Sequence, residues 1–79
     1  MKDMSDIEYH ILLLMMQHAG KIFSAQNLYE SVWQEPYFYS CNSTVMVHIR
    51  HIREKIEINP REPKYLKVVW GIGYKIEKI

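Results

Sequence analysis

The chain has 79 residues, and its composition limits it to one small globular domain. Hydrophobic residues make up 48% of it and charged residues 24%, proportions that are typical of a folded protein and exclude a disordered one. The single cysteine, Cys41, rules out an internal disulfide framework and favours a reducing compartment. The longest apolar run, Ile11 to Met16, is too short to cross a bilayer. We therefore expect a cytoplasmic protein with no membrane segment and no secretion signal.

The formal net charge is +1, but it is distributed unevenly along the chain. Residues 1–47 contain two basic and five acidic residues, whereas residues 48–79 contain eight basic and four acidic ones. Positive charge gathered in one segment suits a surface that faces phosphate groups. A basic face that only contacts solvent would give the same pattern, and charge alone does not separate the two possibilities.

Two helices are predicted in the first half of the chain. Ser5, with a glutamate three positions later, forms a capping box and marks the start of the first helix. This helix is apolar nearly all round, which indicates burial on most sides, and Gly20 is its predicted stop. The second helix is predicted to begin after its N-cap, Ser24, and to end at Val32 or Trp33.

A segment rich in aromatic residues follows, from Gln34 to Cys41. It contains Tyr37, Phe38 and Tyr39, which is more apolar surface than a solvent loop usually carries. These rings either fold back on the core or form a contact surface for another protein, since aromatic residues are enriched at protein interfaces.

The longest predicted helix spans Asn42 to Ile58. Its first residues, Asn42, Ser43 and Thr44, are all good N-cap types, and Asn59-Pro60 ends it. At about 100° per residue, one narrow apolar stripe lies along this helix and is expected to pack on the core. The stripe consists of Val45, Ile49, Ile52 and Ile56.

The opposite face of this helix is small, apolar and basic, with few carboxylates. Such a face is typical of a helix that packs its back on a core and places its front in a nucleic-acid groove. It consists of Ser43, Val47, Arg50 and Glu54, flanked by Met46 and His51.

A β-hairpin is predicted at the end of the chain. Tyr65–Trp70 and Tyr74–Ile79 have the composition of strands, and Gly71-Ile72-Gly73 forms the reversal between them. The predicted fold is therefore α+β: a winged helix-turn-helix, in which three helices precede a C-terminal two-stranded β-hairpin wing.

Other chemistries have little support in the sequence. His48 and His51 are three positions apart with no nearby Cys or Asp, which is poor zinc spacing, so we expect no metal site and no cofactor. Gly71-Ile72-Gly73 is not a nucleotide-binding loop, because no helix follows it. The Ser, His and acidic residues have no recognisable catalytic spacing, so we do not expect an enzyme.

A combination of short motifs resembles the signature of OmpR/PhoB-type winged-helix effector domains of two-component response regulators. The match covers residues 4–78, and the ending Val69–Lys78 is also similar to the VanR-type branch. It rests on Thr44-Val45, Val47-His48-Ile49-Arg50, Ile52-Arg53, and Val69 with Gly71-Ile72-Gly73-Tyr74.

The resemblance implies sequence-specific binding of double-stranded DNA as a transcriptional output domain. The recognition helix, about residues 43–58, would enter the major groove, and the wing, residues 65–79, would reach the adjacent minor groove. Phosphate contacts are implied for Trp33, Ser43, Thr44, Arg50 and Tyr74, and base contacts for Val47 and His51. Two further roles are implied: ion pairing or phosphate contact for Arg53, and a place at the wing tip for Trp70. Met46 is added to the predicted DNA-binding residues because helical periodicity places it beside the groove face.

Three positions depart from the family's usual residues. Ser43 and Trp70 stand where arginine is frequent, and so does His51, which is a weaker and pH-sensitive donor. Met46 and Val47 could contact thymine methyl groups or another protein. These departures keep a second possibility open, namely a winged-helix protein-interaction module with weakened or lost DNA binding.

Family members also carry a receiver domain before the effector domain. We expect residues 1–79 to be a single isolated effector domain, monomeric alone, which a sensor kinase would reach only through the missing receiver. Its expected partners are promoter DNA repeats and RNA polymerase, the latter through Tyr37, Phe38 and Tyr39.

Overall fold

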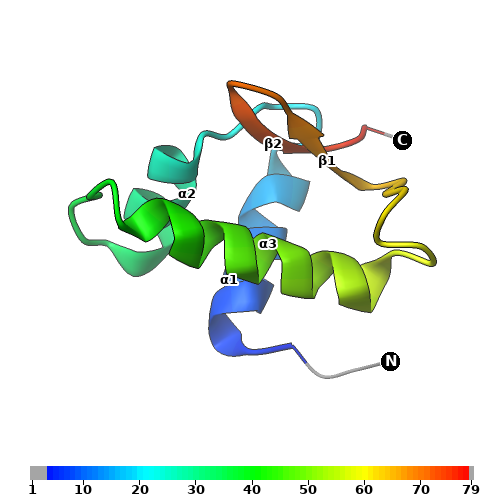
Figure 1. Cartoon of the computed structure of the whole chain (residues 1–79), viewed down its shortest axis with the longest axis horizontal. Helices are drawn as coiled ribbons and strands as arrows, with labels where there is room; N and C mark the ends of the chain where they lie inside the picture. The colour runs from blue at the N-terminus through cyan, green and yellow to red at the C-terminus, as the bar shows by residue number, and fades with distance from the viewer. Residues whose placement is uncertain (1–3, 79) are drawn as a thin grey trace.

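Three helices followed by a β-hairpin form the computed structural model, which describes residues 4–78 (Figure 1). This order confirms the predicted α+β fold. Residues 1–3 of the predicted domain and Ile79 of the predicted second strand lie outside the described residues. The helices are α1 (Asp6–Gln17), α2 (Ala25–Trp33) and α3 (Cys41–Ile56), and the strands are β1 (Leu66–Val69) and β2 (Gly73–Ile76).

Helices α1 and α2 begin at the predicted caps. The Ser5 hydroxyl accepts a hydrogen bond from the Glu8 amide (3.2 Å), and the Glu8 carboxylate accepts one from the Ser5 amide (3.1 Å), which completes the capping box. In the same way, the Ser24 hydroxyl accepts from the Asn27 amide (3.0 Å). Both helix starts therefore follow from local sequence.

Helix α1 is less buried than its composition predicted. Ile11 and Met15 are buried, whereas Leu13 and Met16 are exposed. The prediction of burial on most sides is wrong, because the elements that pack against α1, namely α2, α3 and β2, do not cover Leu13 and Met16.

The apolar stripe of α3 lies at the centre of the core, as predicted. Val45, Ile49 and Ile52 are buried, and Ile56 packs partly against them. Helix α3 runs across α1 and contacts α2 near its own beginning (Figure 1). The buried core consists of Ile11, Met15, Phe23, Leu28, Val45, Ile49, Ile52, Leu66 and Ile76.

Helix α3 begins and ends earlier than predicted. The chain already turns at Phe38, whose carbonyl accepts a hydrogen bond from the Cys41 amide (2.8 Å), so the helix starts at Cys41. The predicted caps therefore lie inside the first turn, where the Ser43 hydroxyl donates to the Ser40 carbonyl (3.2 Å). The helix ends at Ile56 instead of Ile58.

The hairpin is anchored by a segment that the sequence did not single out. Phe23 pairs with Tyr74 of β2: the Phe23 amide donates to the Tyr74 carbonyl (2.7 Å), and the Tyr74 amide donates to the Phe23 carbonyl (2.8 Å). Because Phe23 directly precedes the Ser24 cap, this pairing places the hairpin beside the beginning of α2. Within the hairpin, Leu66 is opposite Ile76 and Val69 is opposite Gly73.

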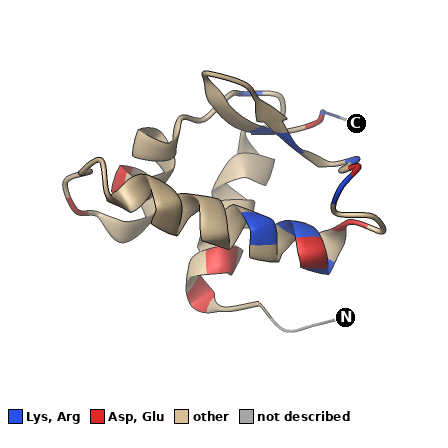
Figure 2. Ribbon diagram, viewed as in Figure 1, with Lys and Arg blue, Asp and Glu red and all other residues tan. Residues whose placement is uncertain are grey.

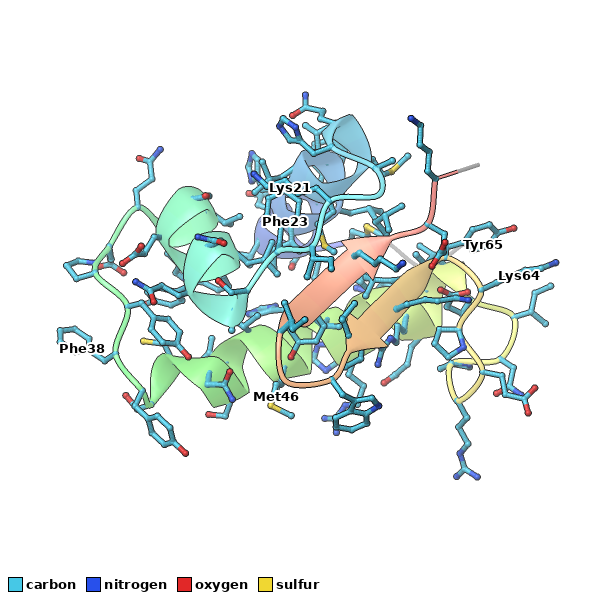
Figure 3. The ribbon with its side chains drawn as sticks, turned by 90° about the horizontal axis from the view of Figure 1, so that it is seen from above. Lys21, Phe23, Phe38, Met46, Lys64 and Tyr65 are labelled. Carbon is cyan, nitrogen blue, oxygen red and sulfur yellow. The ribbon has the colours of Figure 1, made fainter. Side chains whose placement is uncertain are left out.

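The aromatic segment before α3 is divided between core and solvent. The Tyr37 ring packs edge-on against Tyr29, with 5.9 Å between ring centroids. Phe38 points away from the molecule (Figure 3), and Tyr39 is 94% exposed. Folding back on the core is therefore confirmed for Tyr37 and wrong for Phe38 and Tyr39. Within residues 4–78, no helix has the length and apolar character needed to span a bilayer.

Candidate nucleic-acid interface

One face of α3 projects from the domain and carries the residues predicted to enter a groove. Ser43, Val47 and Arg50 are exposed along it, with Val47 at 40%. The buried stripe on the opposite side fixes the rotation of the helix, so this face cannot turn inward without unpacking the core. Arg50 takes part in no ion pair with the described residues, and its guanidinium is therefore available to an anion.

Basic residues are concentrated near this face. Figure 2 shows Lys and Arg on the C-terminal half of α3, in the connection that follows it and on the hairpin. The N-terminal half of α3, from Cys41 to Ile49, contains no Lys, Arg, Asp or Glu. The acidic residues of α1 lie next to α3 in the same view (Figure 2), and one of them, Glu8, contacts Lys55 of α3. The uneven charge along the sequence thus becomes an uneven charge in space.

Arg53 links α3 to the hairpin. Its Nε donates a hydrogen bond to the Leu66 carbonyl of β1 (3.1 Å). Its Nη2 is buried and has no hydrogen-bond partner among residues 4–78. The guanidinium is thus partly committed to holding the hairpin, and the unpaired nitrogen leaves one donor for a further acceptor.

A groove separates α3 from the hairpin. Met46 borders it on the α3 side and lies near the hairpin turn (Figure 3). Trp70 stands at that turn and is 90% exposed, so an indole projects at the wing tip. Residues that line the groove include Met46, Arg53, Trp70, Ile72 and Tyr74.

Tyr74 and Trp33 are half-buried at the edges of this region. Burial raises the pKa of Tyr74, although Arg53 nearby lowers it, so the phenol stays protonated and can donate. The Trp33 ring stacks on Tyr29, with centroids 4.8 Å apart and planes at 13°. It also packs at a tilt against His48, 5.4 Å away. Both side chains are therefore held by packing.

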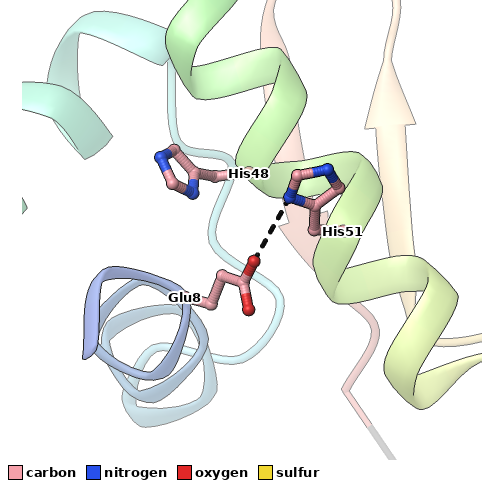
Figure 4. A group of neighbouring side chains, drawn as sticks. All are labelled: Glu8, His48 and His51. Atoms are coloured by element: carbon pink, nitrogen blue, oxygen red, sulfur yellow. Dashed lines mark ion pairs between the residues drawn. The ribbon is translucent and has the colours of Figure 1, made fainter. Parts of the chain in front are cut away.

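His51 is turned toward α1. Its Nδ1 lies 3.4 Å from Oε2 of Glu8 (Figure 4). Through Oε1, Glu8 also contacts the ammonium group of Lys55. Glu8 is only 3% exposed. Burial alone would raise the pKa of Glu8, but Lys55, the Ser5 amide and His51 together lower it, so the carboxylate is ionised. No Cys or Asp lies near the two histidines in the sequence, but the fold places Glu8, which is distant in sequence, beside both of them.

Glu57 is a further organising residue that sequence reasoning missed. Its carboxylate, 7% exposed, accepts hydrogen bonds from the amides of Lys64 (2.8 Å), Tyr65 (3.0 Å) and Leu66 (2.8 Å). Burial would raise the pKa of Glu57, but these three amides and Arg53 lower it overall. One carboxylate at the end of α3 thus fixes the start of β1. The only sequence signal is an acidic residue just before a turn-forming link.

The ten predicted site residues are divided by the fold into two groups. Those of the first group are exposed on the α3 face and at the hairpin turn: Ser43, Thr44, Met46, Val47, Arg50 and Trp70. Those of the second group are partly buried and engaged with other elements: Trp33, His51, Arg53 and Tyr74. The structure therefore leaves the first group accessible to a ligand, brings Met46 and Trp70 of that group to one groove, and holds the second group against neighbouring elements.

Comparison with known proteins identifies relatives with this arrangement. The family described as "Transcriptional regulatory protein, C terminal" matches residues 2–76. The chain is 61% identical over 72 residues to the transcriptional regulatory protein YrkP of Bacillus subtilis, covering 91% of this chain and 31% of YrkP. It is 48% identical over 75 residues to the regulatory protein VanRc of Enterococcus gallinarum, covering 95% and 32%. The chain thus spans about a third of the length of these curated relatives.

Solved structures agree with the sequence comparisons. The response regulator DrrB of Thermotoga maritima, described as an OmpR/PhoB homologue, superposes with a TM-score of 0.84 at 33% identity, covering 96% of this chain and 34% of DrrB. The DNA-binding domain of Klebsiella pneumoniae RstA, solved with its RstA box, also has a TM-score of 0.84, at 27% identity, covering 95% and 73%. The chain belongs to the transcriptional regulatory protein C-terminal family, the OmpR/PhoB-type winged-helix domains of response regulators.

Proposed function

We propose that this chain binds double-stranded DNA sequence-specifically, as the output domain of a two-component transcriptional response regulator. The observation that carries the proposal is the outward face of α3, whose rotation is fixed by the buried stripe and whose Arg50 has no ion-pair partner within residues 4–78. A relative supports it, since the RstA DNA-binding domain of the same fold was solved in complex with its RstA box. The recognition helix enters the major groove, and the hairpin lies at the adjacent minor groove.

The exposed residues take separate roles in this arrangement. Arg50 and Thr44 contact phosphates, and so does Ser43 once its hydroxyl leaves the Ser40 carbonyl; these contacts position the helix without reading sequence. Val47 and Met46 present apolar surface to thymine methyl groups. Trp70 sits at the wing tip, where it offers an indole in place of the cation that a narrow minor groove would attract.

The marginal residues support these contacts. Trp33 and Tyr74 each have a polar group at the edge of an otherwise packed ring, suited to a phosphate oxygen. Arg53 can contact a phosphate through Nη2 only if that buried nitrogen becomes accessible while Nε remains on β1. His51 reads a base edge only after its imidazole leaves Glu8.

Substitution of Arg50 tests the phosphate contact. Arg50→Ala should weaken binding to all duplexes and make the salt dependence of the association constant shallower by about one unit. Lys21→Ala is the matched control, because it removes the same charge from the connection between α1 and α2. Fluorescence anisotropy at several salt concentrations measures both. If the salt dependence for Arg50→Ala equals that of wild type, Arg50 does not contact a phosphate. A separate selection from a random pool of duplexes tests DNA binding as such: if no duplex is enriched, a protein-interaction module is favoured instead.

We also infer that the exposed aromatic segment contacts RNA polymerase in the cytoplasm. Phe38 and Tyr39 project to solvent immediately before the recognition helix, which places them beside DNA-bound machinery. A regulator with alanine at Tyr37, Phe38 and Tyr39 should occupy its promoter but lose transcriptional activation in vitro. Full activation by that variant would refute the contact.

A further inference from the structure

Glu8, His48 and His51 meet where α1 packs against α3, and of the three only His51 is also assigned to DNA binding (Figure 4). Each side chain offers one ligand atom, and these atoms all lie within 4.8 Å of one another. From this geometry we infer that the cluster binds a borderline transition-metal cation such as Zn²⁺, which joins the first helix to the third. The inference does not depend on DNA binding.

The backbone spacing suits coordination. Two ligands three positions apart lie on the same side of a helix, and metal centres in helical bundles use this i, i+3 spacing, with further ligands from neighbouring helices. In a tetrahedral zinc site with bonds of about 2.0–2.2 Å, ligand atoms lie about 3.4 Å apart. His51 Nδ1 and Glu8 Oε2 are already separated by 3.4 Å. The remaining contraction is small enough for side-chain rotation.

The carboxylate is held in place for this role. Glu8 is buried, and its Oε1 accepts from the Ser5 amide and contacts the Lys55 ammonium group. Its Oε2 faces His51 and keeps a free lone pair for a metal. Carboxylates that ligate metals are commonly oriented by such outer contacts.

His48 has an unused ring nitrogen. Its Nδ1 is buried and has no hydrogen-bond partner among the described residues. Coordination through Nδ1 would satisfy this otherwise unpaired nitrogen.

The ligand set selects the kind of metal. Two imidazoles with one carboxylate suit zinc, cobalt or nickel, whereas magnesium and calcium prefer oxygen ligands alone. The Lys55 ammonium beside Glu8 repels cations, so charge alone does not hold an ion here and the bonds to imidazole are required. A water molecule would fill the fourth position.

Cobalt and zinc titrations of the full chain test the inference. Co²⁺ should give the visible absorption bands of a tetrahedral centre, and Zn²⁺ should abolish them and raise the melting temperature in a concentration-dependent way. His51→Ala should weaken Co²⁺ binding about tenfold or more, whereas His10→Ala, a histidine of α1 outside the cluster, should bind as wild type. Circular dichroism in EDTA establishes that each variant is folded.

Imidazole NMR signals give a readout on the wild-type chain that does not depend on variants. On addition of Zn²⁺, the signals of His48 and His51 should shift together, and those of His10 and His18 should not. The inference is overturned if no cobalt bands appear, if His10→Ala loses binding as much as His51→Ala, or if His10 and His18 shift instead.

Discussion

Gly73 is the position where one added methyl group should separate the hairpin from the rest of the domain. An ideal Cβ built at Gly73 lies 2.0 Å from the Phe23 carbonyl oxygen, 2.7 Å from the Phe23 carbonyl carbon and 2.9 Å from Ser24 Cα. All three are backbone atoms, so no side-chain rotation relieves the overlap. In Gly73→Ala the segment that contains Phe23 must therefore move away from β2 by about 1.5 Å to restore an ordinary contact of about 3.5 Å.

The cost follows from the two hydrogen bonds that this movement breaks. The bonds between Phe23 and Tyr74 are 2.7 and 2.8 Å long, and each contributes about 0.5–1.5 kcal/mol net. Residual repulsion adds to their loss, so we expect Gly73→Ala to lower the free energy of unfolding by about 3 kcal/mol. In a domain of this size, that corresponds to a fall in melting temperature of roughly 12–24 °C.

Gly71→Ala is the matched control. Gly71 has φ +78°, but its Cβ would meet no atom within 4 Å. In Gly71→Ala, the left-handed backbone conformation should lower stability by about 1–2 kcal/mol. The substitution also reduces the conformational entropy of the unfolded chain, which restores about 0.4–1 kcal/mol of that loss. Thermal denaturation gives the stability of both variants, and hydrogen exchange gives the protection of individual amides. Exchange of the Phe23 and Tyr74 amides should accelerate in Gly73→Ala and not in Gly71→Ala. Equal stability of the two variants, or unchanged exchange at both amides, would refute the reasoning.

Two further predictions concern buried residues of α3 and its end. Because the pKa of Glu57 is lowered from 4.5 in the folded state, its stabilising contribution is complete above pH 4.5 and is lost as the pH falls through the lower, folded-state value. Glu57→Gln should therefore lower the free energy of unfolding by about 1–3 kcal/mol at neutral pH and flatten its pH dependence, as measured by urea unfolding. The exposed control Glu54→Gln should change neither quantity. Parallel pH profiles for Glu57→Gln and wild type would contradict the prediction. Ile52→Ala should lower the free energy of unfolding by about 2–5 kcal/mol, whereas the exposed control Val47→Ala should lower it by under about 0.5 kcal/mol. An unchanged melting temperature for Ile52→Ala would disprove the role of Ile52 in the core.

Features set by local chemistry were predictable from the sequence. The capping box at Ser5 and the cap at Ser24 depend on residues three positions apart, and both formed as expected. The stripe of α3 depends only on helical periodicity, so the outward direction of Val47 and Arg50 followed from it. The hairpin was placed by its β-branched residues and its glycines.

Features set by distant parts of the chain were not predictable. The bridge of Phe23 to Tyr74, the three amides bound by Glu57, and the approach of His51 to Glu8 all join segments that lack a shared local pattern. The exposure of Leu13 and Met16 was missed for the same reason, because composition does not say which sides of a helix have neighbours. Four of the predicted site residues, Trp33, His51, Arg53 and Tyr74, are engaged with residues from other elements, and their roles in DNA binding remain predictions.

The bridge between Phe23 and Tyr74 also orders events on the ribosome. Synthesis runs from the N-terminus, so the amide and carbonyl of Phe23 emerge about fifty residues before their partner. Contacts between residues this distant in sequence form late in folding, after the helices have formed from local contacts. The nascent chain therefore exposes the unpaired amide and carbonyl of Phe23 until Tyr74 has been synthesised, and a chain truncated before Tyr74 would keep these two backbone groups open to pairing with another chain.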